Sequence, residues 1–395
     1  MINIAIFGFG VVGGGTAEVL TENASLIASR VGEPINIKYI LDLRDFPDSP
    51  FRDCVVHDID VILNDPEVKI CAELMGGSHP AYEFSVRAMK AGKSVVTSNK
   101  EVVANFGPEL LKTAYECGVR YLFEASVGGG IPVIHPIGSC LTANDISEVD
   151  GILNGTTNYI LTEMFSKGKD FDSALKEAQE KGYAERNPSA DVDGIDACRK
   201  ISILSAIAFG SLVQPEEIST EGIRNVTAAD VANAKKIGAA IKLIGRAVKV
   251  GDKISACVAP MFVRETNPLA GITGVYNGIL VNGNAIGDVM FYGRGAGKLP
   301  TASAVVSDII EIAMYLGHPV RPYHVWNRLP KESILSADEI PSKFCLRFAV
   351  KPETLPESVT VITDEPSDFA IVTSEMTPAE LKKKFDGNYT QYRIL

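Results

Sequence analysis

The first fifteen residues constrain the fold of this chain more than any other segment. Ile2–Phe7 is an apolar run of the kind found in strands that are covered on both faces. The loop Gly8-Phe9-Gly10-Val11-Val12-Gly13 follows with the spacing G-x-G-x-x-G, and we expect a helix from about Thr16. Between a strand and a helix, such glycines let backbone N–H groups approach a pyrophosphate at the positive end of the helix. We therefore predict a dinucleotide-binding loop, with a plain tight turn as the alternative.

Up to about residue 140 the chain alternates between short apolar strands and amphipathic helices. The strands are expected at Asn36–Leu41, Lys69–Leu74, Ser94–Thr97 and Arg120–Phe123, and the helices at Pro80–Ala91 and Lys100–Cys117. This alternation implies right-handed crossovers and parallel strands. We predict an α/β protein in which residues 1–140 form a Rossmann-type, doubly wound parallel sheet.

After residue 140 the pattern becomes that of an α+β domain, which we place at 141–300. Its expected elements are strand Ile146–Leu153, helices Asn158–Ser166, Phe171–Lys181 and Asp193–Phe209, and a β-rich stretch at Lys242–Val263. A long helix is expected near Thr301–Leu316. A third pattern, short strands with one helix, predicts a small β-rich unit over 343–395. Its strands are expected at Phe344–Val350, Ser358–Ile362, Phe369–Val372 and Thr390–Leu395, and its helix at Pro378–Phe385.

The charge balance disfavours several classes of partner. The chain has 38 lysines and arginines against 49 acids, a net charge of −11, whereas nucleic acids and anionic membranes require clustered positive charge. Seven scattered cysteines show no zinc or redox spacing and are expected to be reduced thiols. The N-terminus has no signal-peptide pattern, and no apolar run reaches the length of a membrane span. We expect a soluble cytoplasmic protein that binds neither nucleic acid nor membrane.

The end of the second predicted strand bears on the choice of nucleotide. Asp42 stands where an acid is expected to accept hydrogen bonds from a ribose diol. Arg44, two residues on, suits a 2′-phosphate instead. The sequence therefore leaves NAD and NADP as alternatives.

Two polar segments are candidates for further chemistry. Glu124–Pro132 is a glycine turn whose simplest interpretation is a βα connection. The alternative is that its carbonyl oxygens and Glu124 bind a hard cation. In the segment 182–200, Asp193, Asp196 and Lys200 have i, i+3, i+7 spacing and share one helix face. The simpler interpretation is an N-cap and an exposed Asp196–Lys200 pair. The alternative is a group that holds an amino-acid ammonium and moves a proton.

Taken together, the motifs resemble the homoserine dehydrogenase family. The resemblance covers about residues 2–316, and it is most specific in the segments 182–200 and 283–301. The segments that carry it, in family order, are Gly8–Gly13, Glu73–Gly77, Thr97–Lys100, Glu124–Pro132, Gly151–Tyr159, Gly182–Lys200 and Gly283–Thr301.

The resemblance implies reversible NAD(P)H-dependent reduction of L-aspartate 4-semialdehyde to L-homoserine, a branch step toward threonine, methionine and isoleucine. By position, Lys200 matches the proton donor and Lys100 a second lysine at the reacting carbon. Glu185 and Asp196 match residues that hold the substrate amino group and orient Lys200, with Asp191 in support. A homodimer is implied, with a homotetramer as the alternative, and the helix of about 300–318 would return to the nucleotide domain.

The resemblance also implies two binding sites. The monovalent-cation site, usually occupied by sodium, matches Glu124 with the carbonyl groups of Val127, Gly129 and Ile131. With Asp42 and Arg44 from the end of the second strand, the positions expected at the cofactor are Gly8, Phe9, Gly10, Val11, Val12, Gly13, Gly76, Thr97, Ser98, Lys100 and Gly297.

The C-terminal unit resembles an ACT domain, the βαββαβ module that binds threonine as a feedback inhibitor in many longer members of the family. The segment Lys351–Glu357 between its first two strands is too short for the usual first helix and contains two prolines. We therefore predict a degenerate unit without strong threonine inhibition, with an intact sensor as the alternative. Another amino-acid dehydrogenase, such as one acting on aspartate, and a dinucleotide-sensing regulatory protein are the other functions considered.

Overall fold

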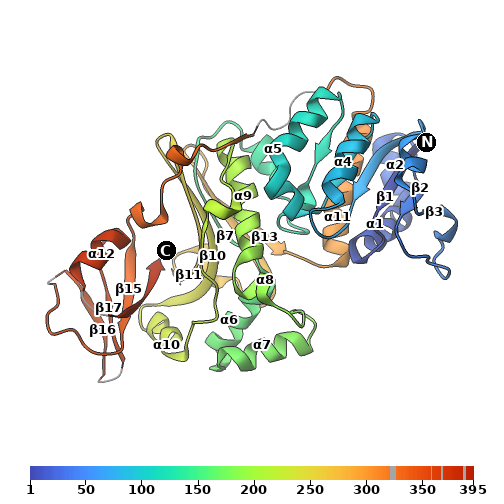
Figure 1. The fold of residues 1–395 in the computed structure, drawn as a ribbon. Coiled ribbons are helices and arrows are strands. Elements are labelled where there is room, and N and C mark those ends of the chain that lie inside the picture. Colours follow the sequence, from blue (N-terminus) through green and yellow to red (C-terminus); the bar gives the residue numbers. More distant parts are fainter. Residues whose placement is uncertain (321–325, 357, 366–367, 386–387) are drawn as a thin grey trace. The chain divides into compact units, whose positions relative to one another are not determined.

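The computed structural model describes residues 1–320, 326–356, 358–365, 368–385 and 388–395 (Figure 1). The chain divides into two compact units. The first consists of Met1–Ala143, Ala206–Leu212 and Gly293–Arg328, and the second of Asn144–Ser205, Val213–Tyr292 and Leu329–Leu395. Among the described residues, no helix combines the length and apolar character that a membrane span requires.

The first unit contains a six-stranded sheet in the order β3-β2-β1-β4-β5-β6, in which every neighbouring pair is parallel. This is the strand order of a dinucleotide-binding Rossmann sheet. The strands are β1 (Ile2–Phe7), β2 (Ile35–Leu41), β3 (Val55–Val56), β4 (Val68–Glu73), β5 (Ser94–Thr97) and β6 (Tyr121–Leu122). The predicted fold class is confirmed, and only the two-residue strand β3 was not expected.

Helices cover both faces of this sheet (Figure 1). They are α1 (Val11–Glu22), α2 (Ala24–Val31), α3 (Ile59–Leu63), α4 (Ala81–Lys90), α5 (Lys100–Glu116) and α11 (Lys298–Met314). Ile2, Ile4 and Ile6 of β1 share one apolar cluster with residues of α1, α2 and α11. Phe7 points to the other face and contacts Phe84 of α4. The alternation of side chains along β1 thus supplies both layers of the core.

Helix α1 begins at Val11, five residues earlier than expected, although three consecutive glycines lie in its first turns. Two of these glycines make close contacts that a side chain would prevent. A Cβ on Gly13 would lie 2.1 Å from the Gly8 carbonyl oxygen. A Cβ on Gly15 would lie 2.9 Å from the Lys298 carbonyl oxygen. Tertiary packing against β1 and α11 therefore overrides the weak helix propensity of glycine.

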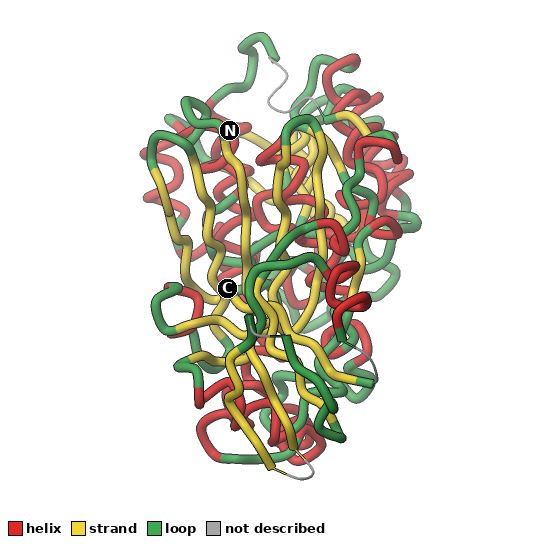
Figure 2. Tube along the Cα trace, turned by 90° about the vertical axis from the view of Figure 1, so that its left-hand side faces the viewer, coloured by secondary structure: helices red, strands yellow, loops and turns green. Residues whose placement is uncertain are grey.

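The second unit is built on a ten-stranded mixed sheet in the order β13-β12-β7-β10-β11-β18-β15-β17-β16, with β9 (Ser219–Thr220) pairing beside β11 (Figure 2). The remaining strands are β7 (Ile146–Ile152), β10 (Ala239–Val250), β11 (Lys253–Arg264), β12 (Tyr276–Gly283), β13 (Gly287–Arg294), β15 (Lys343–Phe348), β16 (Thr360–Glu365), β17 (Asp368–Val372) and β18 (Tyr389–Ile394). A short parallel pair, β8 (Ser211–Leu212) and β14 (Asn327–Arg328), lies in the first unit.

The helices expected in the second unit are present with shifted ends. They are α6 (Gly155–Lys167), α7 (Phe171–Glu180), α9 (Ile195–Phe209) and α12 (Pro378–Lys384). Two further helices, α8 (Ser189–Val192) and α10 (Ala228–Lys236), were not expected. The helix expected at Asp193–Phe209 is α9, which starts two residues later than expected, after α8 has ended at Val192. Gly194, at φ +83°, separates the two helices.

The C-terminal strands continue the sheet of the second unit, because β18 pairs in parallel with β11. Their order β18-β15-β17-β16 is 4-1-3-2, as in a βαββαβ module. Between β15 and β16 the described residues contain no helix, as predicted from the two prolines. Leu355 and Val359 of this connection pack on the apolar cluster that α12 covers, and Arg347 on the opposite face pairs with Asp230 of α10 at 2.6 Å.

The two neighbouring glycines of α1 give a matched test of this packing. Gly13→Ala should lower the free energy of unfolding by about 2–4 kcal/mol, since the added Cβ meets backbone rather than a movable side chain. A Cβ on Gly14 would have no atom within 4 Å. Gly14→Ala should therefore raise the free energy of unfolding by about 0.5–1 kcal/mol. Urea denaturation of both variants measures the difference, and equal stabilities would contradict the close approach.

Candidate active site

The glycine loop lies between β1 and α1, as predicted, and is fixed to the end of β2. The Gly8 N–H donates to the Leu41 carbonyl at 2.8 Å, and the Phe9 N–H donates to the Asp42 carboxylate at 2.8 Å. Gly8 has φ +89°, a conformation that favours glycine, and Gly10 is the N-cap of α1. The positive end of α1 therefore lies directly behind the loop, as pyrophosphate binding requires.

Asp42 and Arg44, which left the choice of nucleotide open, form an ion pair with each other. The Arg44 Nε and Nη2 atoms donate to the two oxygens of Asp42 at 3.0 and 2.9 Å. These bonds, with the Phe9 N–H, hold the pKa of Asp42 well below its usual range. The Arg44 guanidinium also lies 5.1 Å from the ring centre of Phe46. Both groups stand at the carboxyl end of β2, so the structure leaves both nucleotides open.

The other residues matched to the cofactor in the first unit lie at the ends of strands or the start of a helix. Gly76 follows β4, Thr97 is the last residue of β5, and Ser98 follows it. Lys100 is the first residue of α5, and Gly297 is the residue before α11. In a parallel sheet the carboxyl ends of β1, β4 and β5 share one edge, where Rossmann proteins bind nucleotides.

Glu124 organises the predicted cation loop of the first unit through its buried carboxylate. It accepts N–H groups from Val133 at 2.6 Å, Ile134 at 2.9 Å and His135 at 2.7 Å. Its own N–H donates to the buried Asp308, whose pKa is raised well above its usual value by burial. The Glu124 side chain is thus first of all a structural acceptor for the start of the following helical turn.

The carbonyl groups of the same loop have the chemistry of a monovalent-cation site. Gly128 and Gly129 have φ +77° and +55°, so the chain reverses tightly there. Among the described residues, the structure shows no hydrogen bond to the carbonyl oxygens of Val127, Gly129 or Ile131. Oxygen ligands with unused lone pairs suit hard cations, so these residues fit the predicted ion.

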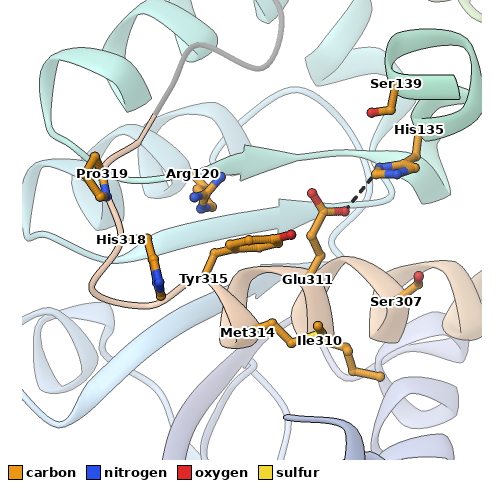
Figure 3. Close-up of a pocket in the computed structure, with 10 residues that line it drawn as sticks. All are labelled: Arg120, His135, Ser139, Ser307, Ile310, Glu311, Met314, Tyr315, His318 and Pro319. Carbon is orange, nitrogen blue, oxygen red and sulfur yellow. Dashed lines mark ion pairs between the residues drawn. The ribbon is translucent and has the colours of Figure 1, made fainter. Parts of the chain in front are cut away.

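A separate cavity of about 940 Å³ lies in the first unit (Figure 3). Figure 3 shows the His135 imidazole facing Glu311, and the two side chains are 3.3 Å apart. The Arg120 guanidinium lies over the Tyr315 ring, 5.2 Å from its centre. None of the residues assigned above by resemblance lines this cavity.

In the second unit, Lys200 and Asp196 form a buried ion pair on α9. The Lys200 ammonium donates to Asp196 Oδ2 and to the Leu153 carbonyl oxygen, both at 2.7 Å. Lys200 is 7% exposed and Asp196 5% exposed, so the simpler expectation of an exposed pair was wrong. A buried ion pair is costly to desolvate and needs further hydrogen bonds to be stable.

Asn154 supplies those further hydrogen bonds and was missed as a site residue. Its Nδ2 atom donates to Asp191 at 2.7 Å and to Asp196 at 2.9 Å, while its Oδ1 accepts the Thr157 N–H and caps α6. The sequence shows only the N-cap, because the carboxylates lie 37 and 42 residues away along the chain. Asn154 therefore joins two of the predicted substrate-binding acids.

Asp191 and Glu185 differ in their surroundings. Asp191 is partly buried, and burial followed by the charge of Asp196 raises its pKa. Glu185 is exposed on the loop between α7 and α8, where its backbone carbonyl accepts a hydrogen bond from Gln179 at 3.1 Å. Among the described residues no side chain bonds to the Glu185 carboxylate. This acid remains available to a cation from outside the chain.

Asn154→Asp tests the electrostatics of this cluster. The variant keeps the N-cap acceptor but adds a third carboxylate beside Asp191 and Asp196, which raises the pKa values of acids in the folded state. Because the folded state then binds protons more tightly, stability should fall as pH rises. We expect a loss of about 1–3 kcal/mol at pH 8 that diminishes toward pH 5, measured by urea denaturation. Asn154→Ser, which adds no charge, should show a pH-independent loss, and identical pH profiles would refute the arrangement.

Comparisons with known proteins agree with this geometry. A family profile described as "Homoserine dehydrogenase" matches residues 132–310, and one described as "Homoserine dehydrogenase, NAD binding domain" matches residues 8–124. The homoserine dehydrogenase of Synechocystis sp. is 45% identical over 318 residues, 79% of this chain and 73% of that relative. The homoserine dehydrogenase of Neisseria gonorrhoeae is 39% identical over 383 residues, 92% of this chain and 86% of that relative.

Solved structures give the same result. A homoserine dehydrogenase from Thiobacillus denitrificans matches with a TM-score of 0.91 and 36% identity, over 100% of this chain and 98% of that one. A hyperthermophilic archaeal homoserine dehydrogenase in complex with NADPH matches with a TM-score of 0.69 and 31% identity, over 81% of this chain and 99% of that one. The Rossmann sheet, the glycine loop and relatives that cover most of the chain lead to one conclusion: this protein belongs to the homoserine dehydrogenase family of NAD(P)-dependent oxidoreductases in amino-acid biosynthesis.

Proposed function

We propose that the protein reduces L-aspartate 4-semialdehyde reversibly to L-homoserine with NAD(P)H, and that Lys200 transfers the proton. The observation that carries this proposal is the buried Lys200 ammonium, fixed by Asp196 and by the Leu153 carbonyl. A bound NAD(P)H would supply the hydride that reaches the aldehyde carbon. The protein must then stabilise and protonate the alkoxide that develops on the aldehyde oxygen.

A fixed ammonium group performs both tasks. Its charge stabilises the developing alkoxide, and one of its N–H bonds supplies the proton. The hydrogen bonds to Asp196 and to the Leu153 carbonyl oxygen fix the orientation of the ammonium group. Lys100 is proposed as the second lysine of the reaction.

The acids of the second unit are proposed to bind the substrate ammonium. Glu185 is exposed, and Asp191 stands beside Asp196 through Asn154. A carboxylate that meets an ammonium forms a charge-assisted hydrogen bond, which plain aldehydes lack. This contact would select a 2-amino substrate.

We further propose that both NAD and NADP are accepted, since Asp42 and Arg44 neutralise each other in the ribose region. Sodium is the cation proposed for the loop of Glu124, Val127, Gly129 and Ile131, where it would brace the chain after β6. The active form is proposed to be a cytoplasmic homodimer, with a homotetramer as the alternative.

Lys200→Ala tests the central role. We expect kcat for homoserine oxidation to fall by about 10²–10⁴-fold, the usual contribution of a positioned acid–base group. Because Lys200 belongs to the second unit, the Kd of NAD(P)H should change little. Lys200→Arg should not restore the rate, since a guanidinium keeps its proton in this pH range. Near-normal turnover of Lys200→Ala would remove the assigned role.

The C-terminal strands lead to a prediction about inhibition. The connection between β15 and β16 packs Leu355 and Val359 on the module core where a first helix would lie. We therefore propose that this unit serves packing, and we expect no inhibition by threonine at an effector site. Any inhibition by millimolar L-threonine should be competitive with homoserine, because the two are isomeric amino acids.

Initial rates over a grid of threonine and homoserine concentrations distinguish the two modes of inhibition. Noncompetitive, saturable inhibition would contradict the prediction. Deletion of the unit is a poor control, because Tyr392 of β18 stacks on Phe262 of β11 with ring centres 4.9 Å apart. Removal of β18 would expose that strand and lower stability for an unrelated reason.

A further inference from the structure

Glu73, the last residue of β4, is a buried acid to which the mechanism above assigns no role. Its side chain is fully buried. One carboxylate oxygen accepts the Thr97 hydroxyl at 2.6 Å, and the other accepts the Met75 N–H at 2.8 Å. The carboxylate thus joins the ends of β4 and β5 at the edge of the sheet where the nucleotide is expected.

The network continues from Thr97 to the start of α5. The Thr97 hydroxyl oxygen accepts the Asn99 N–H at 2.9 Å. Asn99 is the N-cap of α5: its Oδ1 accepts the Val102 N–H at 3.2 Å, and its Nδ2 donates to the Gly77 carbonyl at 2.7 Å. The next residue is Lys100. A chain of short hydrogen bonds therefore runs from Glu73 to the residue that decides where the Lys100 helix begins.

The same network holds the segment after β4. Through the Met75 N–H and the Gly77 carbonyl it fixes residues 74–77, which include Gly76 of the matched cofactor positions. Met75 in turn lies against the glycine loop, since a Cβ on Gly8 would be 2.9 Å from Met75 Cγ. One carboxylate thus joins the segments at the ends of β4 and β5, and the first of these segments lies against the glycine loop.

The choice of an acid at this position is costly for stability. Burial raises the pKa of Glu73 to about 7, and the polar groups around it, Thr97, Met75 N–H and Asn99, are uncharged. An acid buried without a cationic partner is a departure from ordinary core composition, and such departures concentrate at functional sites. We therefore infer that the two carboxylate oxygens are needed as acceptors for the Met75 N–H and the Thr97 hydroxyl.

We propose that Glu73 is a positioning residue of the reaction, which fixes Thr97 and Asn99 and thereby the start of α5 and the placement of Lys100. This inference rests on the proposed function of Lys100 as the second lysine. Glu73 itself acts on hydrogen-bond donors of its own chain and is not proposed to contact substrate or cofactor.

Glu73→Gln is the variant that tests the proposal. The Thr97 hydroxyl and the Met75 N–H bond to different oxygens of Glu73, and an amide places an N–H donor at one of these two positions, so one of the two bonds is lost in its present direction. We expect kcat for homoserine oxidation to fall at least tenfold, with the KM for NAD(P)H changed less than threefold. The melting temperature should change little, since removal of a buried ionisable group offsets the lost hydrogen bond. Tyr121→Phe is the matched control: its buried hydroxyl has no hydrogen-bond partner among the described residues, so its loss should leave kcat unchanged.

A double-mutant cycle separates positioning from general structural damage. If Glu73 acts through Lys100, Glu73→Gln should lower kcat less than twofold in a Lys100→Ala background. An equal loss in both backgrounds, a wild-type kcat in Glu73→Gln, or a wild-type kcat in Lys100→Ala would each overturn the proposal.

Hydrogen exchange gives a readout that does not need turnover. In Glu73→Gln, amides in peptides covering residues 98–104 should exchange at least fivefold faster, whereas Tyr121→Phe should leave them unchanged. If the wild-type protein fails to oxidise homoserine, the proposed function is wrong, and exchange over 98–104 still decides whether Glu73 fixes this segment. Unchanged exchange in Glu73→Gln would overturn that part of the inference.

Discussion

A carboxylate can be buried in a protein only if hydrogen-bond donors or cations surround it, and this requirement shapes the candidate active site. Three such groups each join segments within one unit: Glu73 at the end of β4 and Glu124 after β6 in the first unit, and Asp196 on α9 in the second. Each collects donors from segments that would otherwise be separate loops. The donors are backbone N–H groups for Glu124, a hydroxyl and an N–H for Glu73, and an ammonium and an amide for Asp196.

The same requirement explains why the site is preorganised. The buried Lys200 ammonium pairs with Asp196, and the Asn154 amide donates to the same carboxylate. Asn154 is in turn fixed as the N-cap of α6. The group proposed to transfer the proton is therefore held in place before the substrate arrives, which is what efficient proton transfer requires.

Local sequence patterns predicted much of this arrangement, and they failed where the decisive contacts are distant. The strand Ile2–Phe7 and the glycine loop could be predicted because hydrophobic periodicity and glycine spacing are patterns of a few neighbouring residues. The early start of α1 was missed because only packing makes Gly13 and Gly15 acceptable in a helix. The role of Asn154 could not be predicted from the sequence either, since its two carboxylate partners belong to a segment about forty residues away.

The central claim is that the protein oxidises homoserine at its hydroxyl-bearing carbon with a nicotinamide nucleotide. The most direct test is the initial rate of NAD(P)H formation by the purified protein with L-homoserine or L-aspartate, each with NAD and with NADP. The account predicts formation of reduced nucleotide from L-homoserine with both nucleotides and none from L-aspartate. Turnover of L-aspartate, or tight nucleotide binding without turnover of either amino acid, would contradict it.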